Sequence, residues 1–314
     1  MNIIDTREIE SLHISPSMCV KWADEGLRLK KRSIMPPKTA IHMPGCLDFF
    51  MTMPCLLPPE YGRFGCKNAS RFSCSHPSVK SYMMLCDSNN GDFLSLINCD
   101  WITSWRTGAT AALAILTFRK SDAHIYSFMG LGRAGKAALE CFLDVTRDEV
   151  KTIRLLRYKN HAEETINDVA SRYDNVKFEI CDTITELVVG ADVVVSAITQ
   201  APSLLVEDVT LFKSGILLVP IHTRGFQNCD KIFDKIFGDD TGQISGFKFF
   251  NEFRSFEEFS NVLTGDAKGR ENDEERIIAY NIGLGLHDVY FAYKIESLMS
   301  QRITPPLIAA RPRS

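Results

Sequence analysis

A glycine-rich stretch near the middle of the chain, SFMGLGRAGKAALECFL at residues 127–143, most constrains the fold. An apolar run precedes the three glycines and an amphipathic run follows them, the order of a strand, a tight turn and a helix. Gly130 would allow the turn, Gly132 the close approach of a pyrophosphate, and Gly135 close packing of helix on strand. The helix N-terminus would offer free amides and a partial positive charge to phosphates. This context predicts a dinucleotide-binding loop, with an ordinary glycine turn as the alternative.

Short apolar runs from residue 123 onward extend this pattern. They are AHIYSFMG, KTIRLLRY, NVKFEIC, ADVVVSAI, GILLVPIH and KIFGDD, mostly separated by helical stretches or longer connections. Strands buried on both faces look continuously apolar, and their alternation with helices is typical of a parallel sheet covered by helices. We therefore predict an α/β fold with a Rossmann-type, doubly wound parallel sheet over residues 118–283, which would be the NAD(P)-binding domain.

A chain of 314 residues exceeds the size at which one hydrophobic core usually stops growing, so a second domain is expected. Residues 1–117 mix a helix capped by Ser15 or Ser17 with strand-like runs such as FFMTMPCLL, YMMLCD and FLSLINC, which suggest antiparallel strands. The segment ITSWRTGATAALAILTF is typical of a helix that leads out of this region. Near the C-terminus, IIAYNIGLGLHDVYFAYKIESLMS is predicted as one long amphipathic helix, and QRITPPLIAARPRS as a loose tail.

Charge and composition exclude several classes of function. The 36 basic and 39 acidic residues give a net charge of −3, which provides no electrostatic footprint for nucleic acid. The N-terminal segment is acidic where a secretory signal would be basic, and no apolar run approaches the roughly 20 residues of a membrane span. We expect a cytoplasmic protein that does not enter the membrane.

The ten cysteines are scattered and contain no C-x-x-C pair. Cys74 and His76 are the nearest approach to a metal site, but no second pair lies at ligand spacing. We therefore expect reduced structural thiols and no metal.

The end of the second strand of a Rossmann sheet usually selects the cofactor. An acidic residue there binds the ribose hydroxyls of NAD, whereas basic residues accommodate the 2′-phosphate of NADP. This sequence has Arg157, Tyr158 and Lys159 at that position and no carboxylate. NADP is therefore predicted, with NAD as the alternative cofactor and a solvated basic loop as the structural alternative.

Several separated motifs together resemble the ornithine cyclodeaminase and mu-crystallin family. They are GCKNAS around Lys67, ITSWRTGATAALA around Arg106, the GLGRAG loop, ADVVVSAIT, KIFGDD and NIGLGLHD, in that family's order and approximate spacing. The stretch RTGATAALA is the most specific, because a generic dinucleotide domain has no need of it. The resemblance covers roughly residues 15–295.

The resemblance implies a homodimer in which an α+β substrate and dimerisation domain, residues 1–117 completed by 284–314, lies beside the NAD(P)-binding domain. The substrates would be small amino acids or imines, with hydride transfer to or from the nicotinamide. Lys67 matches a lysine that faces the substrate, and Arg106 an arginine that touches cofactor phosphate close to the active site. The other implied cofactor contacts are the loop residues Gly130, Gly132, Arg133, Ala134 and Gly135, then Ser196, Ala197, Ile198, Ile221 and Asn281.

Two positions depart from the family pattern. After the fifth strand the family has an aspartate that serves as general acid and base, and the aligned segment VPIHTRGFQNCD places His222 there and Arg224 on the family's proline. Lys38 replaces the arginine that usually grips the substrate carboxylate. His222 follows a parallel strand at the end where ligands bind, and its ordinary pKa of about 6.5 suits proton transfer. A structural histidine is the alternative.

These observations predict an NAD(P)-dependent oxidoreductase that interconverts an amino acid or secondary-amine acid and its imine. Lys67, Arg106 and His222 would be catalytic, and Lys38 and Lys67 would bind the substrate. Three alternatives stay open: ornithine cyclodeaminase, an enzyme of an amino-acid conjugate in diaminopropionate or siderophore precursor metabolism, and a non-enzymatic NADP-binding protein. Loss of the aspartate favours simple oxidoreduction over cyclisation with loss of ammonia.

Overall fold

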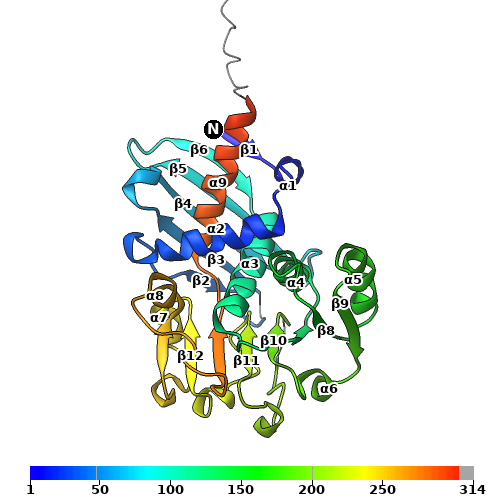
Figure 1. The fold of residues 1–314 in the computed structure, drawn as a ribbon. Coiled ribbons are helices and arrows are strands. Elements are labelled where there is room, and N and C mark those ends of the chain that lie inside the picture. Colours follow the sequence, from blue (N-terminus) through cyan, green and yellow to red (C-terminus); the bar gives the residue numbers. More distant parts are fainter. Residues whose placement is uncertain (47, 200, 304–314) are drawn as a thin grey trace, which may run out of the picture.

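The computed structural model describes residues 1–46, 48–199 and 201–303, which form two β-sheets with helices around them (Figure 1). The helices are α1 (Thr6–Glu10), α2 (Pro16–Arg28), α3 (Asp100–Phe118), α4 (Arg133–Val145), α5 (His161–Val169), α6 (Ile184–Val188), α7 (Thr241–Ile244), α8 (Phe259–Thr264) and α9 (Gly285–Ile303). The strands are β1 (Asn2–Ile4), β2 (Thr39–His42), β3 (Phe49–Leu56), β4 (Arg63–Arg71), β5 (Val79–Asp87), β6 (Phe93–Asn98), β7 (Ile125–Met129), β8 (Lys151–Leu156), β9 (Val176–Cys181), β10 (Val193–Ser196), β11 (Leu217–Pro220), β12 (Lys235–Gly238), β13 (Phe256–Glu258) and β14 (Ile277–Tyr280).

The larger sheet confirms the predicted Rossmann architecture. Its eight strands are parallel, in the order β13-β12-β14-β11-β10-β7-β8-β9. The order reverses between β7 and β10, and ligands of open α/β sheets bind in the crevice at the carboxyl ends of strands at such a reversal. All four residues of β10 and of β11 are buried, which explains why these runs are apolar throughout. The fold therefore directs attention to the segments that follow β7, β10 and β11.

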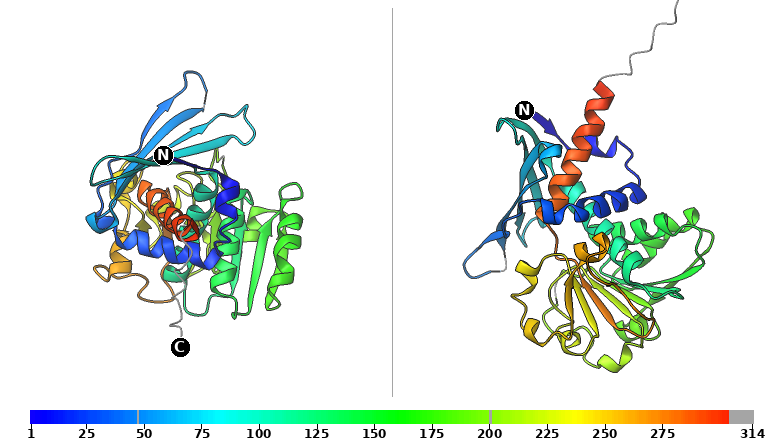
Figure 2. Two further views of the ribbon diagram at one scale, coloured as in Figure 1. Left: turned by 90° about the horizontal axis from the view of Figure 1, so that it is seen from above. Right: turned by 60° about the vertical axis from the view of Figure 1, so that its left-hand side comes forward.

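The smaller sheet has the order β1-β6-β5-β4-β3-β2 and is antiparallel except for the β1–β6 pair. Burial alternates along β4 and β5, so one face of the sheet carries the buried side chains. That inner face packs against α9, with α2 and α3 beside it, as the right-hand view in Figure 2 shows. The long helix α3 then packs against α4 and β11 of the larger sheet. One continuous hydrophobic core joins the two sheets.

The prediction of one long helix over IIAYNIGLGLHDVYFAYKIESLMS is wrong at its start. Ile277–Tyr280 is strand β14, paired on both sides in the middle of the larger sheet and buried along its whole length. Gly283 has φ +88°, a left-handed conformation that favours glycine and ends the extended segment before helix α9 begins at Gly285. A four-residue apolar run has no periodicity that separates a buried strand from a helix, so the tertiary pairing decides.

The predicted cap of the first long helix agrees with the structure. Ser15 is the N-cap of α2, and its hydroxyl accepts a hydrogen bond from the backbone N–H of Met18. All ten cysteines lie in the described part of the chain and are free. Within residues 1–303, less the two gaps, no helix is long and apolar enough to cross a membrane, and no group of three or more potential metal ligands occurs. The predicted tail at 304–314 lies outside the described residues.

Candidate active site

The glycine loop between β7 and α4 has the shape that a dinucleotide requires. Gly130 has φ +84°, and a Cβ there would lie 2.5 Å from the backbone of Ala197 and Ile198. A Cβ on Gly135 would overlap the carbonyl oxygen of Gly130, so this glycine lets the helix approach the loop. Around Gly132, by contrast, no heavy atom would lie within 4 Å of a Cβ. Gly130 and Gly135 are needed by the protein's own packing, and Gly132 leaves an open face at the N-terminus of α4 where phosphates fit.

The basic segment after β8 is only partly available to a ligand. The Arg157 guanidinium donates to Asp182 at 2.5 Å and also pairs with Glu163. Lys159 has φ +51°, its ammonium lies 5.4 Å from the ring centroid of Tyr158, and it makes no hydrogen bond or ion pair with a described residue. Tyr158 itself is exposed. Lys159 is therefore the freer of the two cations at the place where NAD and NADP differ.

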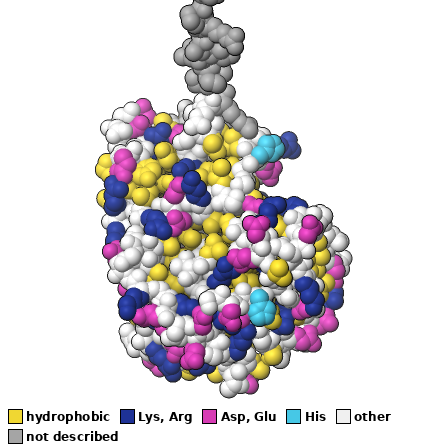
Figure 3. Space-filling view, in the orientation of Figure 1, with side chains coloured by type: hydrophobic (Ala, Val, Ile, Leu, Met, Phe, Trp, Pro, Cys, Tyr) yellow, Lys and Arg dark blue, Asp and Glu magenta, His cyan; other side chains and the backbone are white. Residues whose placement is uncertain are grey.

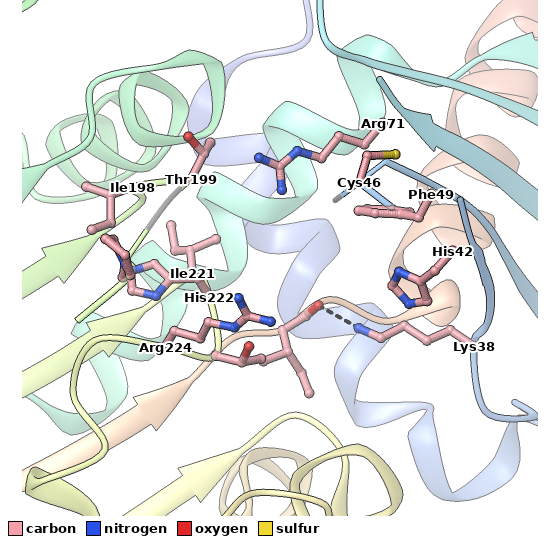
Figure 4. A pocket seen from close by; sticks show the side chains of 14 residues that line it. Lys38, His42, Cys46, Phe49, Arg71, Ile198, Thr199, Ile221, His222 and Arg224 are labelled. Carbon is pink, nitrogen blue, oxygen red and sulfur yellow. Dashed lines mark hydrogen bonds between the residues drawn. The ribbon is translucent and has the colours of Figure 1, made fainter. Parts of the chain in front are cut away.

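A cavity of about 530 Å³ lies between the two sheets (Figure 4). One wall consists of residues that follow the carboxyl ends of β10, β11 and β14, and the other of residues from the segment 38–49 and the end of β4. The described lining residues are Lys38, His42, Cys46, Phe49, Arg71, Ile198, Thr199, Ala201, Pro202, Ile221, His222, Thr223, Arg224 and Ile282. The cavity thus lies where the topology of the larger sheet predicts a ligand.

His222 is half-buried in the wall that belongs to the larger sheet. Its Nε2 lies 2.6 Å from Oγ of Ser196, the last residue of β10, and its ring stacks on Phe226 with centroids 6.2 Å apart. Burial lowers the pKa of His222 below its usual 6.5, although a backbone hydrogen bond at Arg224 opposes the shift. The imidazole is therefore mainly neutral at pH 7, and it is held in place by one hydroxyl.

Two of the predicted catalytic residues meet at a buried carboxylate. Asp288, in the first turn of α9, forms an ion pair with Lys67 Nζ at 2.7 Å and accepts a hydrogen bond from Arg106 Nε at 3.0 Å. Burial alone would raise the pKa of Asp288, but Arg106 and Lys67 outweigh it and hold this pKa below its usual range. Burial lowers the pKa of Lys67 to about 8, against the opposing attraction of Asp288. The three groups are therefore ionised together at neutral pH.

A second buried carboxylate lies close to the same cations. Asp239 follows β12 and accepts from the backbone N–H of Gly283 at 2.7 Å. Burial raises its pKa to about 6, while that hydrogen bond, Lys38 and Arg106 oppose the shift. Lys38 donates to the carbonyl of Ile282 at 3.2 Å, and burial lowers its pKa as well. Three positive charges, on Lys38, Lys67 and Arg106, thus lie near two negative ones, on Asp239 and Asp288.

The structure brings some predicted site residues together and separates others. Lys38, Ile198, Ile221 and His222 line the cavity, whereas Lys67 and Arg106 lie behind it on Asp288. The Arg106 guanidinium lies against Gly283, where a Cβ would be 3.1 Å from its Cζ. The remaining predicted contacts are distributed over the loop and the strand ends: Ala134 in the first turn of α4, Ala197 packed against Gly130, Asn281 buried after β14, and Arg133 with its guanidinium on Val79 and Asp100.

Sequence reasoning missed several residues of the site. Asp288 and Asp239 occur in NIGLGLHD and KIFGDD, motifs that carry the family resemblance but received no role. Each of these aspartates lies next to an apolar run, which indicates that it could be buried. A buried aspartate is unusual and therefore points to a function. Arg71, His42 and Phe49 carry no local signal, because only the pairing of β2, β3 and β4 brings them to the cavity.

A Rossmann sheet with this glycine loop, facing a second sheet across a cavity with a histidine and several cations, defines an NAD(P)-dependent oxidoreductase. More particularly, the chain belongs to the ornithine cyclodeaminase/mu-crystallin family, whose model matches residues 2–302. This result confirms the resemblance that the separated motifs indicate.

Known proteins similar to this chain span most of its length. It is 25% identical over 288 residues to the nodulation efficiency protein NfeD of Rhizobium meliloti, covering 85% of this chain and 84% of that protein. It is 24% identical over 242 residues to a Delta(1)-pyrroline-2-carboxylate reductase of Bacillus cereus, covering 72% of this chain and 73% of that protein.

Two solved structures show the same fold. Thermococcus litoralis Delta(1)-pyrroline-2-carboxylate reductase, in complex with NADH and L-proline, superposes with a TM-score of 0.84 at 18% identity, covering 97% of this chain and 99% of that chain. An archaeal alanine dehydrogenase dimer with bound NAD gives 0.82 at 21% identity, covering 97% of each chain.

Proposed function

We propose that this protein interconverts an amino acid or secondary-amine acid and its imine by hydride transfer. The observation that supports this most is the position of His222 and Lys38 across one cavity, beside the carboxyl ends of the Rossmann strands (Figure 4). The cavity's size suits a small acid, since ligand pockets of about 300–1,000 Å³ are usual for small molecules. The reductase named among the similar proteins acts on such a compound, which is consistent with the proposal.

The roles of the chain's own residues follow from their positions. In the reducing direction the imine carbon gains a hydride and the imine nitrogen gains a proton. When bound, the reduced dinucleotide supplies the hydride and is itself oxidised. His222 gives the proton and takes it back in the oxidising direction, because its ring faces the cavity and Ser196 orients it. Lys38 binds the substrate carboxylate. Lys67 and Arg106, which lie on Asp288 and do not line the cavity, add to the positive charge near it.

Ornithine cyclodeaminase is a less favoured alternative within the same family. That reaction oxidises an amine, closes a ring with a second amine and expels ammonia. It therefore requires more proton transfers in the site than simple oxidoreduction does. The family's aspartate is replaced by His222, whose burial keeps it mainly neutral. A neutral imidazole serves one proton transfer well but offers no negative charge to a cationic intermediate.

NADP is the proposed cofactor, and NAD the alternative. Lys159 is free to meet a 2′-phosphate, and Arg157 could contribute if it released one of its two carboxylates. Replacing Lys159 with alanine should raise the KM for NADPH by about tenfold, the worth of one charged hydrogen bond, and leave the KM for NADH unchanged. The measurement is initial rates with each cofactor at saturating substrate. An unchanged ratio of the two KM values in both Lys159→Ala and Arg157→Ala would contradict the assignment.

A homodimer is also proposed, because the outer face of the smaller sheet exposes several large apolar side chains, among them Ile41, Tyr82 and Met84. The predicted cytoplasmic location stays a prediction.

The function is tested by NADPH and NADH consumption with cyclic imines of proline and pipecolic acid type, and with 2-oxo acids supplied with ammonia or methylamine. Products are identified by mass. We expect consumption with at least one imine and an amino acid as product. Release of ammonia and proline from ornithine with only catalytic cofactor would instead establish the cyclodeaminase. Tight binding of NADPH without turnover of any imine or amine would favour a non-enzymatic binding protein.

A further inference from the structure

We infer that the substrate carries a second carboxylate and that Arg71 and Arg224 bind it. The inference rests on the proposed function, since it concerns the same cavity, and it narrows the substrate to the imine of a dicarboxylic or N-carboxyalkyl amino acid. It starts from an imbalance of charge inside the cavity.

The side chains that line the cavity carry a net positive charge, whereas the whole chain carries a net charge of −3. Lys38, Arg71 and Arg224 line it, and no aspartate or glutamate is among its described lining residues. The whole chain has 39 acidic residues against 36 basic ones. On the outer face drawn in Figure 3, acidic and basic side chains are interspersed. Positive charge gathered in a concave site of such a protein favours an anionic ligand, because the low-dielectric walls focus the field there.

The Arg71 and Arg224 side chains make no hydrogen bond or ion pair with any residue that the structure describes. Elsewhere in the molecule guanidinium groups are used structurally, as in the pairs Arg119–Glu149 and Arg63–Glu296. Arg71 is half-buried, and Arg224 is exposed at the edge of the cavity. A free guanidinium fork of this kind matches a carboxylate, which it can bind through two parallel hydrogen bonds.

The positions of the cations suit an elongated substrate with a carboxylate at each end. Figure 4 shows Lys38 on one side, tied to Ile282, while Arg71 and Arg224 extend toward the middle of the cavity from opposite walls. Lys38 is the group proposed for the α-carboxylate. The side chain of Phe49, on the wall opposite the predicted cofactor contacts Ile198 and Ile221, supplies apolar surface for the methylenes between the two acids. The second carboxylate is therefore assigned to the arginines.

The phosphates of the dinucleotide are a second possible ligand for positive charge. The loop that would receive them, between β7 and α4, is separate from the cavity. The open face at Gly132 lies at the N-terminus of α4, and none of the three loop glycines lines the cavity. The tests below include dinucleotide affinity, so that the two ligands are distinguished.

The kinetic test compares two substrates that differ in one carboxylate: 2-oxoglutarate with methylamine, and 2-oxopentanoate with methylamine. We expect kcat/KM to be roughly ten- to a hundredfold higher for the diacid, as charged hydrogen bonds to a guanidinium would give. Arg71→Gln and Arg224→Gln should each reduce this ratio at least severalfold. Arg254→Gln is the matched control, because Arg254 is an exposed arginine paired with Asp234 and does not line the cavity.

A binding test decides the inference even if neither imine is turned over. Glutarate and pentanoate, which cannot react, are titrated into the NADPH-loaded full chain by calorimetry at fixed ionic strength, and the dissociation constant of NADPH is measured for each variant. Tighter binding of glutarate, lost in Arg71→Gln and Arg224→Gln and kept in Arg254→Gln, supports the inference. Equal affinities for the two acids would overturn it. Weaker NADPH binding in the variants with an unchanged glutarate preference would also overturn it, by assigning the arginines to cofactor phosphate.

Discussion

At the residue scale, His222 is the side chain on which the proposed chemistry depends most. Its replacement with alanine should lower kcat by on the order of 10² or more, the usual contribution of a general acid or base. Because burial lowers its pKa below 6.5, the neutral form needed for amine oxidation predominates at pH 7. The oxidation rate should therefore be level above about pH 6.5 and fall at lower pH.

The control for His222 is Ser196→Ala, which removes its hydrogen-bond partner and leaves the imidazole in place. This variant should lose less activity than His222→Ala, and it should retain the acid limb of the pH profile. The measurement is the steady-state rate of the unmodified protein and the two variants between about pH 5 and pH 8, roughly the range around the ordinary pKa of histidine. A loss of only a few-fold in His222→Ala, with the same acid limb, would mean that His222 is structural.

A buried carboxylate outside the cavity gives a prediction about stability. Asp230 accepts a hydrogen bond from the Tyr280 hydroxyl at 2.6 Å, and burial raises its pKa to about 6. Since the pKa is higher in the folded state than in the unfolded chain, protonation favours folding. This contribution is complete below about pH 4 and is lost as the pH rises through about 6.

Asp230→Asn should therefore stabilise the protein at pH 7.5, by about 1–2 kcal/mol, because asparagine keeps an acceptor for Tyr280 and carries no charge. The gain should disappear toward pH 4. Urea unfolding of both proteins at several pH values measures the difference, with Asp168→Asn, an exposed site, as control. A difference in unfolding free energy that does not vary with pH would contradict the assignment.

At the scale of secondary-structure elements, the β7–α4 loop allows cofactor binding to be separated from folding. Gly132→Ala places a methyl group on the open face, at φ −79°, where the protein itself has no atom within 4 Å. We expect an unchanged or slightly higher Tm, since alanine is unstrained there. Dinucleotide affinity should fall by about tenfold or more, because the methyl occupies the place of a pyrophosphate.

Fluorescence titration with NADPH and a thermal scan check this loop prediction. Gly246→Ala is the matched control, because an added Cβ there would have its nearest contact at 3.7 Å and the position is remote from the loop. Unimpaired NADPH binding in Gly132→Ala would show that the dinucleotide does not use this face.

The elements also show what a sequence can and cannot indicate. The strand before Gly130 and the helix after Gly132 could be predicted because apolar pattern and glycine placement are local properties of the sequence. Strand β14 was missed because four apolar residues adjoin a helical pattern, and only pairing with β11 and β12 fixes their conformation. Arg71 was missed because its function depends on an antiparallel register that its own neighbours do not encode. Local signals therefore predicted the Rossmann half well and the cavity wall from the smaller sheet poorly.

At the scale of the whole molecule, the smaller sheet leaves one face without cover in the described chain (Figure 2). Cross-strand register places Ile41, Phe50, Phe64, Tyr82 and Met84 on that face, with exposures of 62, 37, 37, 50 and 40%. Its opposite face holds Lys67 and the buried core. An apolar sheet face of this kind marks an interaction surface, and a second copy of the chain is the proposed partner.

The double variant Tyr82→Glu/Met84→Lys should convert a dimer into a monomer of 35.3 kDa, because charges on an apolar interface are costly to bury. Val150→Glu is the control, since Val150 is 81% exposed and lies outside this sheet. Light scattering after size exclusion gives the masses. A monomeric unmodified protein at micromolar concentration would rule out the proposed dimer.

The measurement that tests the central claim most directly is the fate of the transferred hydrogen. NADPH deuterated at the transferring position of the nicotinamide is supplied with an imine that the protein reduces, and the amino-acid product is examined by mass spectrometry and NMR. The account predicts one deuterium on the carbon that bears the carboxylate and the amine, with none arriving when the reaction is run with unlabelled NADPH in D₂O. Product without deuterium at that carbon, or deuterium that reaches that carbon from the solvent, would contradict hydride transfer in this cavity.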